Sequence, residues 1–185
     1  MNTTFEITPA RGPDDVRSFG VLLEELTRWD IEMSRASGLD VDALLQFHHE
    51  HSLEDFVAEL EPPAGRLLLA KDETGAFGCA ALRALTSEIG EVKSLYVRPS
   101  YRGRGAASAL MRALIAEGMT IGYRALRLTS AAFMTDAHRV YDAMGVQADR
   151  AVLRGAARAR RRGHLHGAPA ALDVIPRQVV DAFET

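Results

Sequence analysis

The segment that decides the fold covers residues 95–110 and reads Leu-Tyr-Val-Arg-Pro-Ser-Tyr-Arg-Gly-Arg-Gly-Ala-Ala-Ser-Ala-Leu. It is typical of a strand, a turn marked by Pro99, and a glycine-containing loop that leads directly into an apolar helix. The first N–H groups of such a helix lack intrahelical partners and carry partial positive charge. With the neighbouring arginines, they predict a binding site for a phosphate or pyrophosphate group.

The sequence on either side predicts an α/β domain. Upstream, residues 66–70 and 77–85 flank a turn and predict an antiparallel hairpin, and residues 91–97 predict the next strand. Downstream, residues 106–121 predict a helix buried against the sheet, and residues 125–129 predict a further strand. A helical crossover places this last strand parallel to the strand at 91–97. The sheet is therefore expected to be mixed.

Two common nucleotide motifs do not fit the glycine loop. A dinucleotide fingerprint needs a third glycine, and Ser108 stands at that position. A P-loop needs Gly-Lys followed by Ser or Thr, and the chain has no such triplet. Nicotinamide and mononucleotide cofactors are therefore poor candidates.

The order Arg102-x-x-Gly105-x-Ala107 at the start of a helix resembles the signature of the GNAT superfamily of N-acetyltransferases. A second resemblance lies in residues 137–145, Ala-His-Arg-Val-Tyr-Asp-Ala-Met-Gly. The resemblance implies the acyl-CoA N-acyltransferase fold: a mixed sheet, antiparallel in its first half, splayed between strands four and five, with helices on both faces. It also implies transfer of an acetyl group from acetyl-CoA to a primary amine, with a small molecule expected as the acceptor.

The same resemblance implies which residues bind acetyl-CoA. Loop amides are expected to bind the pyrophosphate, and the preceding strand is expected to pair with the pantetheine arm and stabilise the oxyanion at a bulge. Met134 replaces an asparagine that family members often have near the cofactor. The expected cofactor-binding residues are Leu95, Tyr96, Val97, Arg102, Gly103, Arg104, Gly105, Ala106 and Ala107.

Two side chains are candidates for proton transfer. The resemblance implies that Tyr141 is the general acid that protonates the leaving thiolate; the alternative is a core tyrosine with a satisfied hydroxyl. It also implies that Glu91 is the general base; the alternative is a carboxylate paired with Lys93. Counting every second residue along the strand puts Glu91 on the same face as Val97.

The composition and short motifs of the chain indicate which partners, metals and cellular locations to expect. The net charge of -3 gives no reason to expect a nucleic-acid partner, and no apolar run is long enough to span a membrane. The N-terminus lacks the features of a signal peptide, and Cys79, the one cysteine, cannot form an internal disulfide, so a cytoplasmic location is expected. Residues 48–51, His-His-Glu-His, lack the spacing of a helical zinc site, and no metal is expected. The sequence is compatible with a homodimer.

The C-terminal segment departs from the family pattern. We expect one acetyltransferase domain over residues 1–150 and an atypical basic tail over residues 151–185, which contains an arginine run at 158–162. Either the last strands of the family are degraded in this tail, or the sequence leaves its ancestral reading frame near residue 150. An alternative function follows: a non-catalytic module of GNAT fold that binds acyl-CoA without turnover.

Overall fold

The described part of the computed structural model covers residues 4–38, 41–42, 52–131, 133–148 and 174–179. Within these residues the strands form one sheet, in the order β1-β2-β3-β4-β5-β7-β6. All neighbouring pairs are antiparallel except β4 and β5, which are parallel. The strands are β1 (Glu6–Pro9), β2 (Arg66–Asp72), β3 (Gly75–Ala84), β4 (Ile89–Val97), β5 (Ala125–Ala131), β6 (Gln147–Ala148) and β7 (Val174–Val179).

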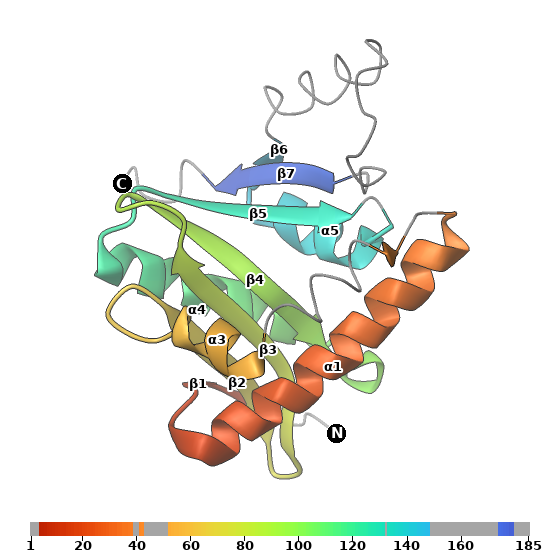
Figure 1. Ribbon diagram of the computed structural model, residues 1–185, viewed down its shortest axis with the longest axis horizontal. Coiled ribbons are helices and arrows are strands. Elements are labelled where there is room, and N and C mark those ends of the chain that lie inside the picture. Colours follow the sequence, from red (N-terminus) through yellow and green to blue (C-terminus); the bar gives the residue numbers. More distant parts are fainter. Residues whose placement is uncertain (1–3, 39–40, 43–51, 132, 149–173, 180–185) are drawn as a thin grey trace.

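Helices cover both faces of this sheet (Figure 1). One face carries α1 (Gly12–Ala36) and α3 (Leu53–Ala58), and the other carries α4 (Ala106–Ile121) and α5 (Thr135–Ala143). A short 3-10 helix, η1 (Pro99–Tyr101), connects β4 to the loop before α4. The α/β architecture predicted from the sequence, with its mixed sheet, is confirmed.

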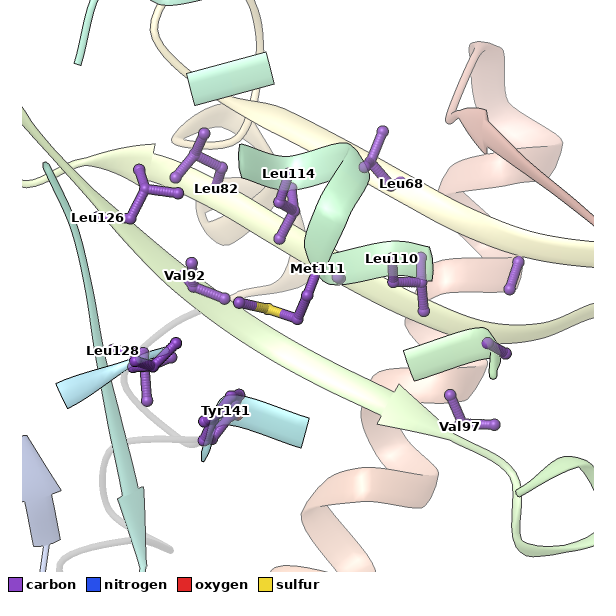
Figure 2. Close-up of a cluster of buried hydrophobic side chains, with 14 of the residues drawn as sticks. Leu68, Leu82, Val92, Val97, Leu110, Met111, Leu114, Leu126, Leu128 and Tyr141 are labelled. Carbon is purple, nitrogen blue, oxygen red and sulfur yellow. The ribbon is translucent and has the colours of Figure 1, made fainter. Parts of the chain in front are cut away.

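The side chains between α4 and the sheet form the larger of two cores (Figure 2). Leu110, Met111 and Leu114 of α4 are fully buried against Leu82 and Leu126 of the sheet. Burial of one such side chain contributes about 1.5–3 kcal/mol. The second core, built around Phe19 and Leu22, lies between the sheet and α1.

The parallel strands β4 and β5 stay paired only near their starts. Their pairing joins Ile89–Glu91 to residues 125–127, and beyond this point the two strands diverge, as Figure 1 shows. Gly90 permits the close pairing, because a Cβ atom there meets side chains of Leu82, Tyr123 and Leu126 at 2.8 Å. The predicted splay between the fourth and fifth strands is therefore present.

A bulge interrupts β4 at Ser94. The pairs Cys79↔Tyr96 and Ala81↔Lys93 leave two β4 residues opposite one β3 residue. Ser94 has a φ of 53°, an uncommon value for a residue other than glycine. The fully buried Cys79 thiol donates a hydrogen bond to the Ser94 carbonyl oxygen, at 3.3 Å. The bulge changes which β4 side chains share a face.

The C-terminal segment contributes a strand to the sheet. β7 pairs with β5 over residues 126–131 and 174–179, and β6 pairs with the other edge of β7. The sheet therefore continues beyond residue 150, where the domain was expected to end. The arginine run at 158–162 lies outside the described residues.

Candidate active site

A cavity of about 600 Å³ lies where the end of β4 meets the start of α4. It is lined mainly by apolar side chains and by the backbone of the glycine loop. All of the residues expected to bind the cofactor line it except Arg104, whose Nη2 donates to the Ser100 carbonyl oxygen at 3.1 Å. We refer to this cavity as the loop pocket.

The glycine loop presents backbone donors to the loop pocket. Gly103 and Gly105 have φ values of 76° and 83°, in the left-handed region that glycine adopts most easily. The first bond of α4 joins the Ala109 N–H to the Gly105 carbonyl, so the N–H groups of residues 106–108 point out of the helix end. These donors and the helix dipole fit a pyrophosphate, and the apolar walls fit a pantetheine arm.

Arg102 and Trp29 form one wall of the loop pocket. The Arg102 Nε donates to the Val97 carbonyl oxygen at 3.1 Å, and its guanidinium lies 5.8 Å from the centre of the Trp29 ring. Trp29 also contacts Phe133 edge-on, at 5.8 Å between ring centres. Besides packing against Phe133, Trp29 therefore has a position on the wall of the pocket.

A second cavity, of about 780 Å³, lies between α1, α3 and the diverging strands β4 and β5. Most of its walls are apolar, and they include Val92 on β4 and Leu128 on β5. We refer to it as the splay pocket. Four residues line both cavities, so the two adjoin one another there: Leu26, Leu95, Met134 and Ala137.

Tyr141 lies in the splay pocket, on α5. Its side chain is 5% exposed, and it packs with the core beneath α4 (Figure 2). His138, one turn earlier on α5, lies near it, and a His138 ring nitrogen is 3.1 Å from the Ser130 hydroxyl. Tyr141 is therefore both a core residue and a wall of the cavity, and its role as general acid stays a prediction.

Glu91 lines neither pocket. Its Oε2 accepts a hydrogen bond from the Arg83 Nε at 2.8 Å, and Lys93 lies 3.7 Å from its Oε1. Arg83 also pairs with Glu59 at the end of α3, which places this cluster on the face of α1 and α3. The expectation that Glu91 shares a face with Val97 is wrong, because the bulge shifts the alternation and Val97 packs in the α4 core.

The splay pocket is lined by two acidic side chains that the sequence reasoning did not consider, Glu24 and Asp30, and Glu24 is exposed. Asp30 of α1 lines the cavity, and its buried Oδ1 has no hydrogen-bond partner among the described residues. Burial raises the pKa of Asp30 to about 7. The spacing of Asp30 in the sequence could have identified it. Asp30 lies one turn after Leu26 and continues the apolar stripe of Phe19, Leu22 and Leu26.

Metal sites and membrane-spanning helices are two further questions that the sequence raised. Among the described residues there is no group of His, Cys, Asp or Glu side chains that could hold a metal ion. The histidines at 48, 49 and 51 lie outside the described residues. No helix in the described part of the chain has the length and apolar character needed to cross a membrane.

Comparisons with known proteins agree with this geometry. The chain is 28% identical over 146 residues to an uncharacterized N-acetyltransferase of Schizosaccharomyces pombe, covering 77% of this chain and 83% of that protein. Its fold is similar to an acetyltransferase of Streptococcus agalactiae (TM-score 0.67, 13% identity, 95% of this chain and 98% of the other). It is also similar to the PaiA N-acetyltransferase of Thermoplasma acidophilum in complex with coenzyme A (TM-score 0.66, 14% identity, 95% and 98% coverage). The model of the acetyltransferase (GNAT) family matches residues 24–146, and the chain belongs to that family.

Proposed function

We propose that this protein transfers an acetyl group from acetyl-CoA to a primary amine of a small molecule. The observation that carries the proposal is the junction of the two pockets at Leu26, Leu95, Met134 and Ala137. A thioester held in the loop pocket and an amine held in the splay pocket can meet at this junction. Such positioning is itself a large part of the catalysis of a two-substrate reaction.

The loop pocket supports acetyl-CoA as the donor. The N–H groups at the start of α4 and the Arg102 guanidinium offer positive charge to a pyrophosphate. Beyond Glu91, β4 no longer pairs with β5, so its backbone edge in the splay is available to an extended amide-containing arm. The related PaiA enzyme, described in complex with coenzyme A, supports the same choice.

The reaction needs three functions around the thioester carbonyl. The amine must be deprotonated, the oxyanion of the tetrahedral intermediate needs donors, and the leaving thiolate must receive a proton. We assign the last function to Tyr141 in the splay pocket. We assign the oxyanion to backbone N–H groups next to the Ser94 bulge, where β4 borders both cavities.

The general base must take a proton from the amine, so it needs a carboxylate or other base that is not already engaged. Glu91 stays a candidate, but its carboxylate is already paired with Arg83 and Lys93.

The cytoplasmic location, a homodimer and the absence of a nucleic-acid partner also stay predictions.

Two measurements on the whole chain test the proposal. Calorimetric titration is expected to show binding of CoA and acetyl-CoA, and a thiol assay is expected to show CoA release with members of a panel of primary amines. Failure to bind CoA contradicts the donor assignment. Binding without CoA release across the panel supports the alternative of a non-catalytic acyl-CoA-binding module.

A further inference from the structure

We infer that Asp30 binds the ammonium group of the acceptor in the splay pocket and accepts its proton, and that this acceptor is a primary amine with an apolar body. The inference rests on the proposed function and deepens it. It names a residue that matches no motif of the sequence and a substrate class narrower than primary amines in general.

Asp30 lies on a face of α1 that lines the splay pocket. Leu23, Thr27 and Asp30 are spaced by four and three residues on α1, so they form one helix face, and all three line the splay pocket. The pocket also contains Tyr141, and at Leu95 it adjoins the loop pocket. Asp30 and Tyr141 can therefore act on the same bound molecule.

Asp30 has a buried carboxylate oxygen, Oδ1, with no hydrogen-bond partner in the part of the chain that the structure describes. A buried carboxylate oxygen without a hydrogen bond is costly, and native proteins keep such groups mainly where a ligand or water completes them. The Asp30 Oδ1 accepts no hydrogen bond from the described residues. By contrast, the carboxylate of Glu25 is bound by Arg98, and that of Glu91 is bound by Arg83. An incoming ammonium group supplies both the missing donor and the opposite charge.

The other charged groups of the splay pocket do not satisfy Asp30. Besides Tyr141, the titratable or charged side chains that share this cavity in the described chain are Glu24, Arg28 and Lys93. Lys93 lies beside Glu91, and burial is the cause of the raised pKa of Asp30. A pKa near 7 suits a group that must accept a proton at neutral pH.

The walls of the cavity indicate the body of the acceptor. Around the acidic group, the splay pocket is lined mostly by apolar side chains from α1, α3, β4 and β5, among them Leu23, Leu53, Phe56 and Leu128. An amine with a single ammonium group and an aromatic or alkyl body places its charge on Asp30 and its carbon atoms against these walls. A polyamine carries further charges, and burying them against these apolar side chains is unfavourable.

The proposed step is balanced in protons and electrons. Asp30 takes one proton from the ammonium group, and the freed nitrogen lone pair forms the C–N bond with the thioester carbonyl carbon. When the C–S bond breaks, its electron pair goes to sulfur, which takes the phenolic proton of Tyr141. The Tyr141 phenolate then takes the second nitrogen proton, and Asp30 releases the first proton to water. The products are the amide, CoA and one proton.

The test compares four forms of the whole chain: wild type, Asp30→Asn, Glu91→Gln and Glu32→Gln. Glu32 is the matched control, because it lies two residues from Asp30 on α1, is exposed and lines neither pocket. Each form is assayed by CoA release from acetyl-CoA with 2-phenylethylamine and with spermidine, between pH 6 and pH 9. Calorimetry measures 2-phenylethylamine binding to each CoA-loaded form, and a thermal melt checks folding.

We expect Asp30→Asn to lower kcat/KM for 2-phenylethylamine about 10²–10⁴-fold, to abolish the rise of kcat/KM near pH 7, and to leave CoA affinity within about twofold. We expect wild type to prefer 2-phenylethylamine to spermidine, and Glu32→Gln to match wild type. A folded Asp30→Asn protein with wild-type kcat/KM overturns the inference, as does a larger loss in Glu91→Gln or a preference for spermidine.

The outcomes also separate this inference from the proposed function. If wild type releases no CoA with any amine, the proposed function fails. In that case, binding of 2-phenylethylamine that Asp30→Asn abolishes still supports Asp30 as an ammonium site. Absence of that binding overturns the inference as well.

Discussion

The loop pocket and the splay pocket adjoin one another but are built in different ways. The loop pocket depends on backbone geometry in one continuous segment, from the end of β4 through two left-handed glycines into α4. The splay pocket depends on side chains from α1, α3, β4, β5 and α5, which meet only in the folded chain. Under the proposed function, donor binding and acceptor choice are therefore encoded separately, and four substitutions test that separation.

The largest effect is expected on the splay side, from Tyr141→Phe. Loss of a general acid lowers kcat by about 10²–10⁴-fold, whereas CoA affinity in the loop pocket should stay within about twofold. The measurement is CoA release at saturating acetyl-CoA, with calorimetry for binding.

Tyr123→Phe is a matched control for Tyr141→Phe. Tyr123 is equally buried, but its hydroxyl donates to the Ala64 carbonyl oxygen at 2.7 Å, and it lines neither pocket. Its loss should cost about 1 kcal/mol of stability without slowing turnover. Equal kcat values in the two variants would remove Tyr141 from the mechanism.

The second effect is the change in the free energy of unfolding when the carboxyl group of Asp30 is removed from the splay pocket. The pKa of Asp30 is about 7 in the folded protein against an ordinary value of 3.8, so between these values the folded state binds more protons than the unfolded state. The contribution of Asp30 to stability is therefore most favourable below about pH 4 and falls as the pH rises to 7. Asp30→Asn should raise the free energy of unfolding at pH 8 by up to about 4 kcal/mol, and by less at pH 5.

Urea denaturation at both pH values measures this change. Glu32→Gln, on the exposed side of the same helix, should change the free energy little at either pH. A destabilised Asp30→Asn protein at pH 8 contradicts the expectation, because it means that the carboxylate has a favourable partner.

The third effect is expected on the loop side. Gly105→Ala places a side chain at a φ of 83°, which costs about 1–2 kcal/mol, and relaxation of the loop moves the donors at the start of α4. CoA affinity should fall about 5–30-fold, measured by calorimetry. Gly122→Ala, at a φ of 100° and the other end of α4, imposes a similar strain and should leave CoA affinity unchanged. Equal losses in both would show that α4 stability, rather than loop geometry, controls binding.

The smallest effect is expected from Arg102→Gln. Its side chain is 37% exposed, so its attraction for a phosphate is screened, and CoA affinity should fall about two- to fivefold. The loss should shrink as salt is added. Arg112→Gln, exposed on α4 and outside both pockets, serves as the control in the same titration. A loss that does not depend on salt would indicate a packing role against Trp29 instead.

The sequence predicted the elements around the loop pocket well, because their signals are local. The expected helix at 106–121 has the observed bounds of α4, and the expected strands at 91–97 and 125–129 lie within β4 and β5. Glycines, a proline and apolar periodicity mark all of these within short windows.

The splay pocket was harder to predict for a physical reason. No local pattern shows that Asp30 of α1 and Tyr141 of α5 line one cavity, because the sheet topology brings them together. The bulge at Ser94 carries no glycine or proline, so strict alternation put Glu91 and Val97 on one face. The pairing of β7 with β5 could not be predicted, because its partner lies far upstream in the chain.

The hydrogen bond beneath the bulge also has a practical consequence. Cys79 is the one cysteine of the sequence, and its thiol is fully buried with a pKa that burial raises far above neutrality. The intact protein should therefore not react with thiol reagents, so a colorimetric reading during turnover counts only the CoA released. When Cys79 does become labelled, β3 has separated from its neighbours, and the labelling rate measures how often the sheet opens.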